Sequence, residues 1–155
     1  RCAALKNELC RVLEEVRGRG YTHFICGMAQ GSDLYFAEAV LALREKHPEV
    51  SLEAAVPFPG QADGWSAGQK ERYQRLLQSC DIETMVQGFY TPDCMHRRNR
   101  YMVERSSLLL AVYDGSRGGT GYTILQALRK GLELIQIDPS ALPSASRLPC
   151  VPRQS

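Results

Sequence analysis

The residues best suited to binding chemistry lie in two glycine-rich segments, 27–33 and 114–121. Each segment follows an apolar run and precedes an amphipathic one, so each is expected to join a strand to the start of a helix. Glycine lets a backbone approach a ligand, and the free amides of a helix N-terminus favour a negatively charged group. We therefore expect phosphate or ribose contacts, with a simple turn or a flexible surface loop as the alternative. The residues expected to make them are Gly27, Met28, Ala29, Gly31, Ser32, Asp33, Asp114, Gly118, Gly119 and Thr120.

The first segment does not follow a standard nucleotide-binding motif. It is neither G-x-G-x-x-G nor a P-loop, because no lysine follows it. Ser32 or Asp33 can cap the helix that begins there. In a nucleotide site Asp33 could instead accept a hydrogen bond from a ribose hydroxyl.

Three arginines, Arg97, Arg98 and Arg100, stand near the start of a helix expected at about 95–105. The N-terminus of a helix carries a partial positive charge that repels cations, so a nearby anion would reduce this repulsion. Successive helix positions spread over the whole circumference, so only one or two of these residues can face a crevice. We expect Arg98 to do so, with Asn99 second, and His96 to lie on the surface.

Aromatic side chains offer a place for a base or a nicotinamide-like ring. Phe58 and Trp65 lie in a proline- and glycine-containing stretch after an expected strand, and Tyr90 follows the next strand. Ring packing on these three residues is one interpretation, although a tryptophan is more often part of a core.

Catalytic and metal sites have little support in the sequence. No Ser, Cys or Thr has an evident histidine partner, and the glycine segments hold no paired carboxylates. The six cysteines form no C-x-x-C pair and have no histidine at ligand spacing, so we expect free thiols and no metal. A disulfide framework, which an even number of cysteines permits, is the alternative.

The glycine-rich segments are positioned by strands and helices, which alternate along the chain. The expected strands, each preceded by a helix, cover 22–26, 52–56, 82–86, 108–113 and 134–137. Strands that are apolar on both faces are typical of a parallel sheet between helices. We therefore expect an α/β protein with a Rossmann-like doubly wound parallel sheet in three layers, α/β/α. In this architecture ligands bind at the carboxyl ends of the strands.

Composition predicts one globular domain. The chain has 155 residues, 44% of them hydrophobic and 23% charged, with a net charge of +2. We expect a single domain at 1–139 and an irregular or disordered tail at 140–155. The charge is too even for a dedicated nucleic-acid binder, and the longest apolar run, 108–112, is too short to cross a bilayer. A cytoplasmic protein without a membrane partner is expected, and homo-oligomerisation stays open.

Three ordered motifs strongly resemble the YpsA-like branch of the SLOG superfamily: 24–33 (FICGMAQGSD), 98–102 (RNRYM) and 113–120 (YDGSRGGT). That superfamily groups Rossmann-like domains related to the lonely-guy phosphoribohydrolases and to the DNA-processing protein DprA. The resemblance spans about 5–139. It implies a bacterial nucleotide-binding sensor or regulatory domain of an uncharacterised family, with NAD, ADP-ribose or a nucleoside monophosphate-like molecule as ligand.

The sequence departs from this pattern in two places. Lonely-guy enzymes carry a glutamate shortly after the glycine loop, whereas the matching stretch 123–126 is Thr-Ile-Leu-Gln. A nucleotide N-glycosidase of the phosphoribohydrolase kind is therefore the alternative function, and single-stranded DNA binding as in DprA a weaker one. The family also normally begins with a strand before the first helix. This chain starts after that strand, so we expect either that the sequence is a fragment or that the strand is supplied differently, leaving an exposed groove between its neighbours.

Overall fold

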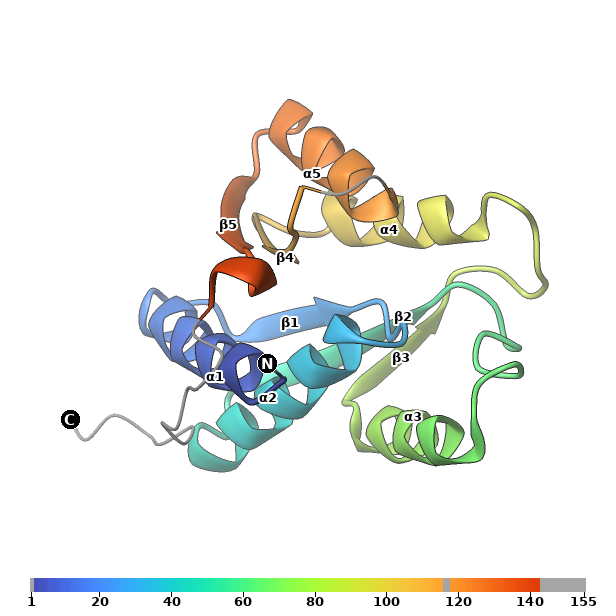
Figure 1. Cartoon of the computed structure of the whole chain (residues 1–155), viewed down its shortest axis with the longest axis horizontal. Helices are drawn as coiled ribbons and strands as arrows, with labels where there is room; N and C mark the ends of the chain where they lie inside the picture. Colours follow the sequence, from blue (N-terminus) through green and yellow to red (C-terminus); the bar gives the residue numbers. More distant parts are fainter. Residues whose placement is uncertain (1, 116–117, 143–155) are drawn as a thin grey trace.

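The computed structural model describes residues 2–115 and 118–142, and these form alternating helices and strands (Figure 1). The helices are α1 (Cys2–Gly18), α2 (Ser32–Lys46), α3 (Ala67–Ser79), α4 (Cys94–Glu104), α5 (Gly119–Arg129) and the short 3-10 helix η1 (Pro139–Ala141). The strands are β1 (His23–Cys26), β2 (Ser51–Val56), β3 (Ile82–Met85), β4 (Leu108–Val112) and β5 (Glu133–Ile137). The expected order of elements is confirmed. Most of the tail expected at 140–155 lies outside the described residues.

All strands pair in parallel, which confirms the expected α/β class with a Rossmann-like arrangement. They divide into two sheets, however: one has the order β1-β2-β3, and the other consists of β4 and β5. Within the described residues no strand pairing joins β1 to β4. The described strands therefore form two parallel sheets, and the division falls between β1 and β4.

The core of the larger sheet is built by α1, α2 and β2. Apolar residues recur every three or four positions on both helices and pack against each other and the sheet. The helix residues in this core include Leu9, Val12, Leu13 and Val16 of α1 and Leu34, Ala37, Val40 and Leu43 of α2. The central strand β2 is buried from Leu52 to Val56. Its one ionisable side chain, Glu53, is therefore enclosed by protein.

Helix α4 connects the two sheets. Figure 1 shows α4 and α5 together on the side of the two-stranded sheet, with α1, α2 and α3 around the larger sheet. From α4, Arg98 donates a hydrogen bond to the carbonyl of Gly27 beyond β1, and Tyr101 donates one to Glu53 on β2. These two contacts fix α4 over the larger sheet.

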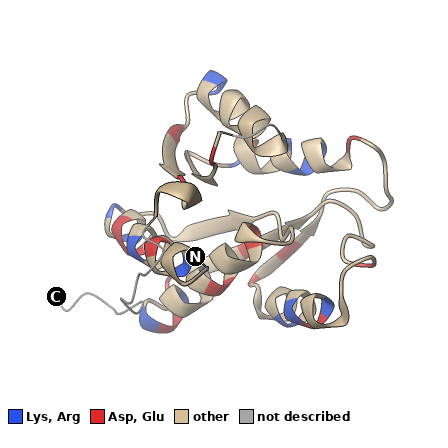
Figure 2. Cartoon of the chain, viewed as in Figure 1, with Lys and Arg blue, Asp and Glu red and all other residues tan. Residues whose placement is uncertain are grey.

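The surface carries both signs of charge. Figure 2 shows lysines and arginines interspersed with aspartates and glutamates on α1 and α2. None of the helices in the described part of the chain combines the length and the apolar character that a membrane span requires. Nor do the described residues bring together three or more His, Cys, Asp or Glu side chains that could hold a metal ion.

The cysteines differ from the expectation at one position. Cys26, Cys80 and Cys94 are free thiols, as expected. Cys10 is disulfide-bonded, so the expectation of free thiols is wrong for this residue. A disulfide depends on the separation and direction of two Cβ atoms in the folded chain, and spacing along the sequence does not reveal these.

Candidate functional site

The loop after β1 is held by hydrogen bonds to its own side chains. Asp33 accepts a hydrogen bond at Oδ2 from the amide of Ala29, at 3.0 Å. The Cys26 thiol donates to the Asp33 carbonyl at 3.3 Å and accepts from the amide of Met28 at 3.4 Å. Asp33 therefore closes the loop and makes no side-chain cap for α2, whose N-cap is Gly31.

Two residues of this loop adopt left-handed backbone conformations. Gly31 has φ of 96°, which a residue with a side chain adopts only with strain. Met28 has φ of 57° although it has a side chain, and that side chain is fully buried. A non-glycine residue in this region costs on the order of 1 kcal/mol, so the surrounding contacts must maintain the conformation.

Arg98 is the buried cation of the site. Its residue is only 6% exposed. Nη1 donates to the Gly27 carbonyl at 2.6 Å and to Oε1 of Gln61 at 3.3 Å, and Nε donates to Oδ1 of Asn99 at 2.8 Å. The guanidinium also covers Gly27, since a Cβ there would lie 2.9 Å from its Cζ, Nε and Nη1 atoms. The structure thus brings Gly27 together with Arg98 and Asn99, which the sequence placed in two separate candidate segments.

Gln61 is a member of the site that the sequence did not select as a contact residue. It is buried, and its Nε2 donates to the Met28 carbonyl at 3.1 Å while its Oε1 accepts from Arg98. A single amide side chain therefore links the loop to the guanidinium. The available signal was its place just after the apolar run 52–56, since strand ends carry functional residues in this fold class.

Burial controls the ionisation of the two acidic groups beside Arg98. Burial raises the pKa of the Asp33 carboxyl above its usual value, although the charge of Arg98 and the amide of Ala29 oppose the shift. Burial raises the pKa of the Cys26 thiol strongly, and the nearby Asp33 raises it further. Cys26 is thus a neutral thiol and no nucleophile at neutral pH.

The second glycine segment leads into α5. Gly118 precedes the helix as its N-cap with φ of 148°, and no side chain caps the first turn. Gly118, Gly119 and Thr120 are exposed, as is Asp114, whereas 116–117 lie outside the described residues. The amides at the start of α5 are therefore without a side-chain cap, like those at the start of α2.

The two glycine segments belong to different sheets, and α4 contacts the elements on both sides. Arg98 reaches the Gly27 loop, while the His96 ring packs edge-on against Tyr122 of α5, with ring centroids 5.2 Å apart. His96 is exposed, as expected.

The three aromatic residues separate into two groups. Phe58 and Tyr90 pack edge-to-face with centroids 5.3 Å apart, and Tyr90 is 63% exposed. Trp65 instead packs against Tyr73 at 5.2 Å, as part of the layer that borders the core. Phe58 and Tyr90 therefore form a ring pair after β2 and β3. Trp65 packs against the core, which was the alternative interpretation for this residue.

Parallel strands alternating with helices, and a glycine loop at the carboxyl end of β1, define a Rossmann-like α/β protein. The family model described as the YspA SLOG family matches residues 1–138, and the chain belongs to that family. The resemblance to the YpsA-like branch of the SLOG superfamily is thereby confirmed.

Two kinds of relatives illustrate the match. The chain is 36% identical over 129 residues to the "Uncharacterized SPbeta prophage-derived protein YoqJ" of Bacillus subtilis (strain 168), covering 75% of each chain. It is 29% identical over 133 residues to a UPF0398 protein of Bacillus thuringiensis (strain Al Hakam), covering 84% of this chain and 70% of that relative.

Proposed function

We propose that this chain is a sensor or regulatory domain that binds a phosphorylated nucleotide, such as NAD, ADP-ribose or a nucleoside monophosphate. The observation that carries the proposal is the buried guanidinium of Arg98, which lies against the loop between β1 and α2. A desolvated cation interacts strongly with a phosphate, because little water screens it.

The surrounding groups suit the other parts of such a ligand. The uncapped first turns of α2 and α5 offer backbone amides and positive dipole ends to phosphate oxygens. The exposed ring of Tyr90, packed on Phe58, offers a stacking surface for a base. The ligand therefore runs, in this proposal, from phosphates at the glycine loops to a base at the ring pair.

A pair of substitutions at Gly119 tests the contact with α5. Gly119 is the first residue of the helix, and a Cβ there meets no atom within 4 Å. Gly119→Pro removes one N–H at a position where the helix does not use it, whereas Gly119→Ala keeps the N–H. Isothermal titration with ADP-ribose, NAD and AMP should show about tenfold weaker binding for the proline variant only, since a charge-assisted hydrogen bond contributes about 1.5 kcal/mol or more.

The wild-type chain provides the broader test. A thermal-shift panel of these nucleotides should raise its melting temperature, and chromatography after incubation should return the nucleotides intact, because 123–126 contains no carboxylate. No thermal shift with any nucleotide would remove the proposal. Release of free base would instead establish the N-glycosidase alternative.

A further inference from the structure

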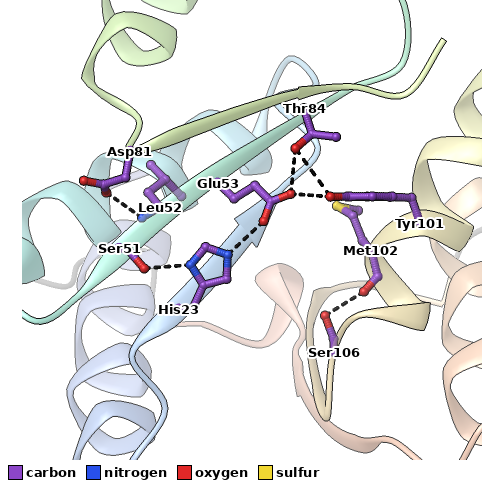
Figure 3. Close-up of polar contacts among 9 residues, drawn as sticks. All are labelled: His23, Ser51, Leu52, Glu53, Asp81, Thr84, Tyr101, Met102 and Ser106. Carbon is purple, nitrogen blue, oxygen red and sulfur yellow. Dashed lines mark hydrogen bonds and ion pairs between the residues drawn. The ribbon is translucent and has the colours of Figure 1, made fainter.

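A serine, a histidine and a glutamate lie in one row on the larger sheet, away from the glycine loops. His23 on β1 pairs in register with Ser51 on β2, and Glu53 follows two residues later on the same face of β2. Nδ1 of His23 lies 2.6 Å from Oγ of Ser51, and Nε2 lies 2.8 Å from Oε1 of Glu53 (Figure 3). The imidazole therefore bridges a hydroxyl and a carboxylate.

Glu53 is held in its ionised form. Burial favours the neutral acid, but hydrogen bonds from Tyr101, His23 and Thr84 outweigh it and hold the pKa of Glu53 below its usual value. Tyr101 and Thr84 both donate to Oε2, at 2.6 and 2.9 Å, so Oε1 faces His23 (Figure 3). An ionised carboxylate only accepts hydrogen bonds, so Nε2 must carry the proton.

This fixed tautomer makes His23 a base toward Ser51. With the proton on Nε2, a neutral imidazole presents the lone pair of Nδ1 to the Ser51 hydroxyl. A hydroxyl next to an oriented base is the arrangement that activates a serine nucleophile. In the Ser-His-Asp triad Nε2 faces the serine and Nδ1 faces the carboxylate, whereas here Nδ1 faces Ser51 and Nε2 faces Glu53. The proton relay is otherwise the same.

The cluster is accessible and distinct from the nucleotide site. The His23 side chain is 39% exposed, and Ser51 is half-buried. Both residues begin their strands, whereas the Gly27 loop follows the last residue of β1. His23 and the Gly27 loop therefore lie at opposite ends of β1.

We propose that Ser51 is a nucleophile toward small activated carboxylic esters. Its Oγ attacks the ester carbonyl carbon as its proton passes to Nδ1 of His23. The C–O bond to the leaving group then breaks, and that proton leaves with the alcohol. The product is an acyl ester on Ser51, which water hydrolyses by the same relay to release the acid and restore the hydroxyl.

Deacylation is expected to be slow. The amide of Ser51 donates to the Thr22 carbonyl at 2.8 Å, and the amide of Leu52 donates to Oδ2 of Asp81 at 2.8 Å. Neither amide is free to stabilise an oxyanion. Stabilisation of the oxyanion by hydrogen-bond donors is usually the largest single contribution to catalysis of such a reaction. The same lack of donors slows acylation, but an activated ester carries a much better leaving group than the serine ester that it forms. The acyl form of Ser51 should therefore accumulate and be detectable.

The test is acetylation of the whole chain by p-nitrophenyl acetate, followed by peptide mass spectrometry. Ser79 is the control, because its hydroxyl donates to the backbone carbonyl of Arg75, which is not a base. Ser51 should acquire an acetyl group about 100-fold faster than Ser79, the low end of what a positioned general base supplies. Equal rates at the two serines would overturn the proposal.

Two variants separate activation from mere exposure. Ser51→Ala should remove the acetylated peptide, and His23→Gln should slow acetylation of Ser51 about 100-fold. His23 is partly exposed, so His23→Gln should retain the circular dichroism spectrum of the wild type. Unchanged acetylation of Ser51 in a folded His23→Gln protein would show that His23 does not activate Ser51 and that the cluster has only a structural role.

Discussion

The guanidinium of Arg98 lies directly on the backbone of Gly27. Nη1 donates to the Gly27 carbonyl at 2.6 Å, and the space that a Cβ would need at position 27 is filled by the guanidinium. The two residues are 71 positions apart, so this contact joins α4 to the loop after β1. It makes Gly27 and Arg98 a unit whose parts can be tested separately.

The substitution Gly27→Ala should displace Arg98. The added Cβ would lie 2.9 Å from three atoms of the guanidinium, and Arg98 is buried, so the contact cannot relax without cost. Overpacking of this kind destabilises by about 1–3 kcal/mol, which urea unfolding would measure. Gly68→Ala is the control, since Gly68 is exposed and no atom lies within 4 Å of its Cβ position. Equal stability of the two variants would show that the loop accommodates the methyl group.

Arg98→Ala should reduce both stability and nucleotide affinity. Removing the side chain leaves the Gly27 carbonyl and Gln61 without their donor, at about 1–3 kcal/mol of unfolding free energy. Loss of a charge-assisted phosphate contact would weaken binding by about 1.5–3 kcal/mol. Calorimetric titration of the folded variant with ADP-ribose measures the second effect. Unchanged affinity would limit Arg98 to holding the loop.

Asp33 should make the protein less stable as the pH rises. Because burial raises the pKa of the folded carboxyl above the ordinary value of 3.8, the folded state binds the proton more tightly than the unfolded chain does. The contribution is therefore fully present below pH 3.8 and is lost as the pH rises through the folded-state pKa.

Asp33→Asn should remove this dependence. The amide cannot ionise, and its oxygen can still accept the hydrogen bond from Ala29. Unfolding free energies of both proteins at several pH values from acid to neutral give the measurement. The difference between variant and wild type should shift in favour of the variant as the pH rises. A difference that is constant with pH would contradict the buried-carboxyl interpretation.

Tyr101→Phe should weaken the attachment of α4 to β2. The phenol donates to the ionised Glu53 at 2.6 Å, and hydrogen bonds to charged groups contribute about 1.5–3 kcal/mol. Because the pKa of Glu53 is lowered by its donors, their stabilisation is present above the unfolded-state pKa and is lost as the pH falls through the folded one. The cost of Tyr101→Phe should therefore shrink in acid. Tyr90→Phe, at an exposed ring, should change stability by less than about 0.5 kcal/mol in the same unfolding assay.

Local features of the fold could be predicted from the sequence. The recurrence of Leu5, Leu9, Val12 and Val16 specifies an amphipathic helix without reference to any distant residue, and the apolar run 108–112 specifies a strand. Helix starts after the glycine segments were predictable for the same reason. Arg98 could also be selected from the sequence. Arg97, Arg98 and Arg100 point in different directions around one helix, so only one or two of them can face inward.

The contacts that give the sites their chemistry could not be predicted in this way. Gln61 and Gly27 are separated from Arg98 by 37 and 71 residues, so their contact depends on where α4 packs. The sequence also offered no evident histidine partner for a serine, and that expectation is wrong for Ser51. His23 and Ser51 are 28 residues apart and meet only because β1 and β2 pair in one particular register.

By itself, then, the sequence determined the helices, the strands, their parallel class and the two glycine loops, since each depends on periodicity or on turn residues within about a dozen positions. The tertiary structure alone decided the division into two sheets, the burial of Arg98 on Gly27 and the row of Ser51, His23 and Glu53. Those features depend on strand register and helix packing, which set distances between residues that are remote in the chain.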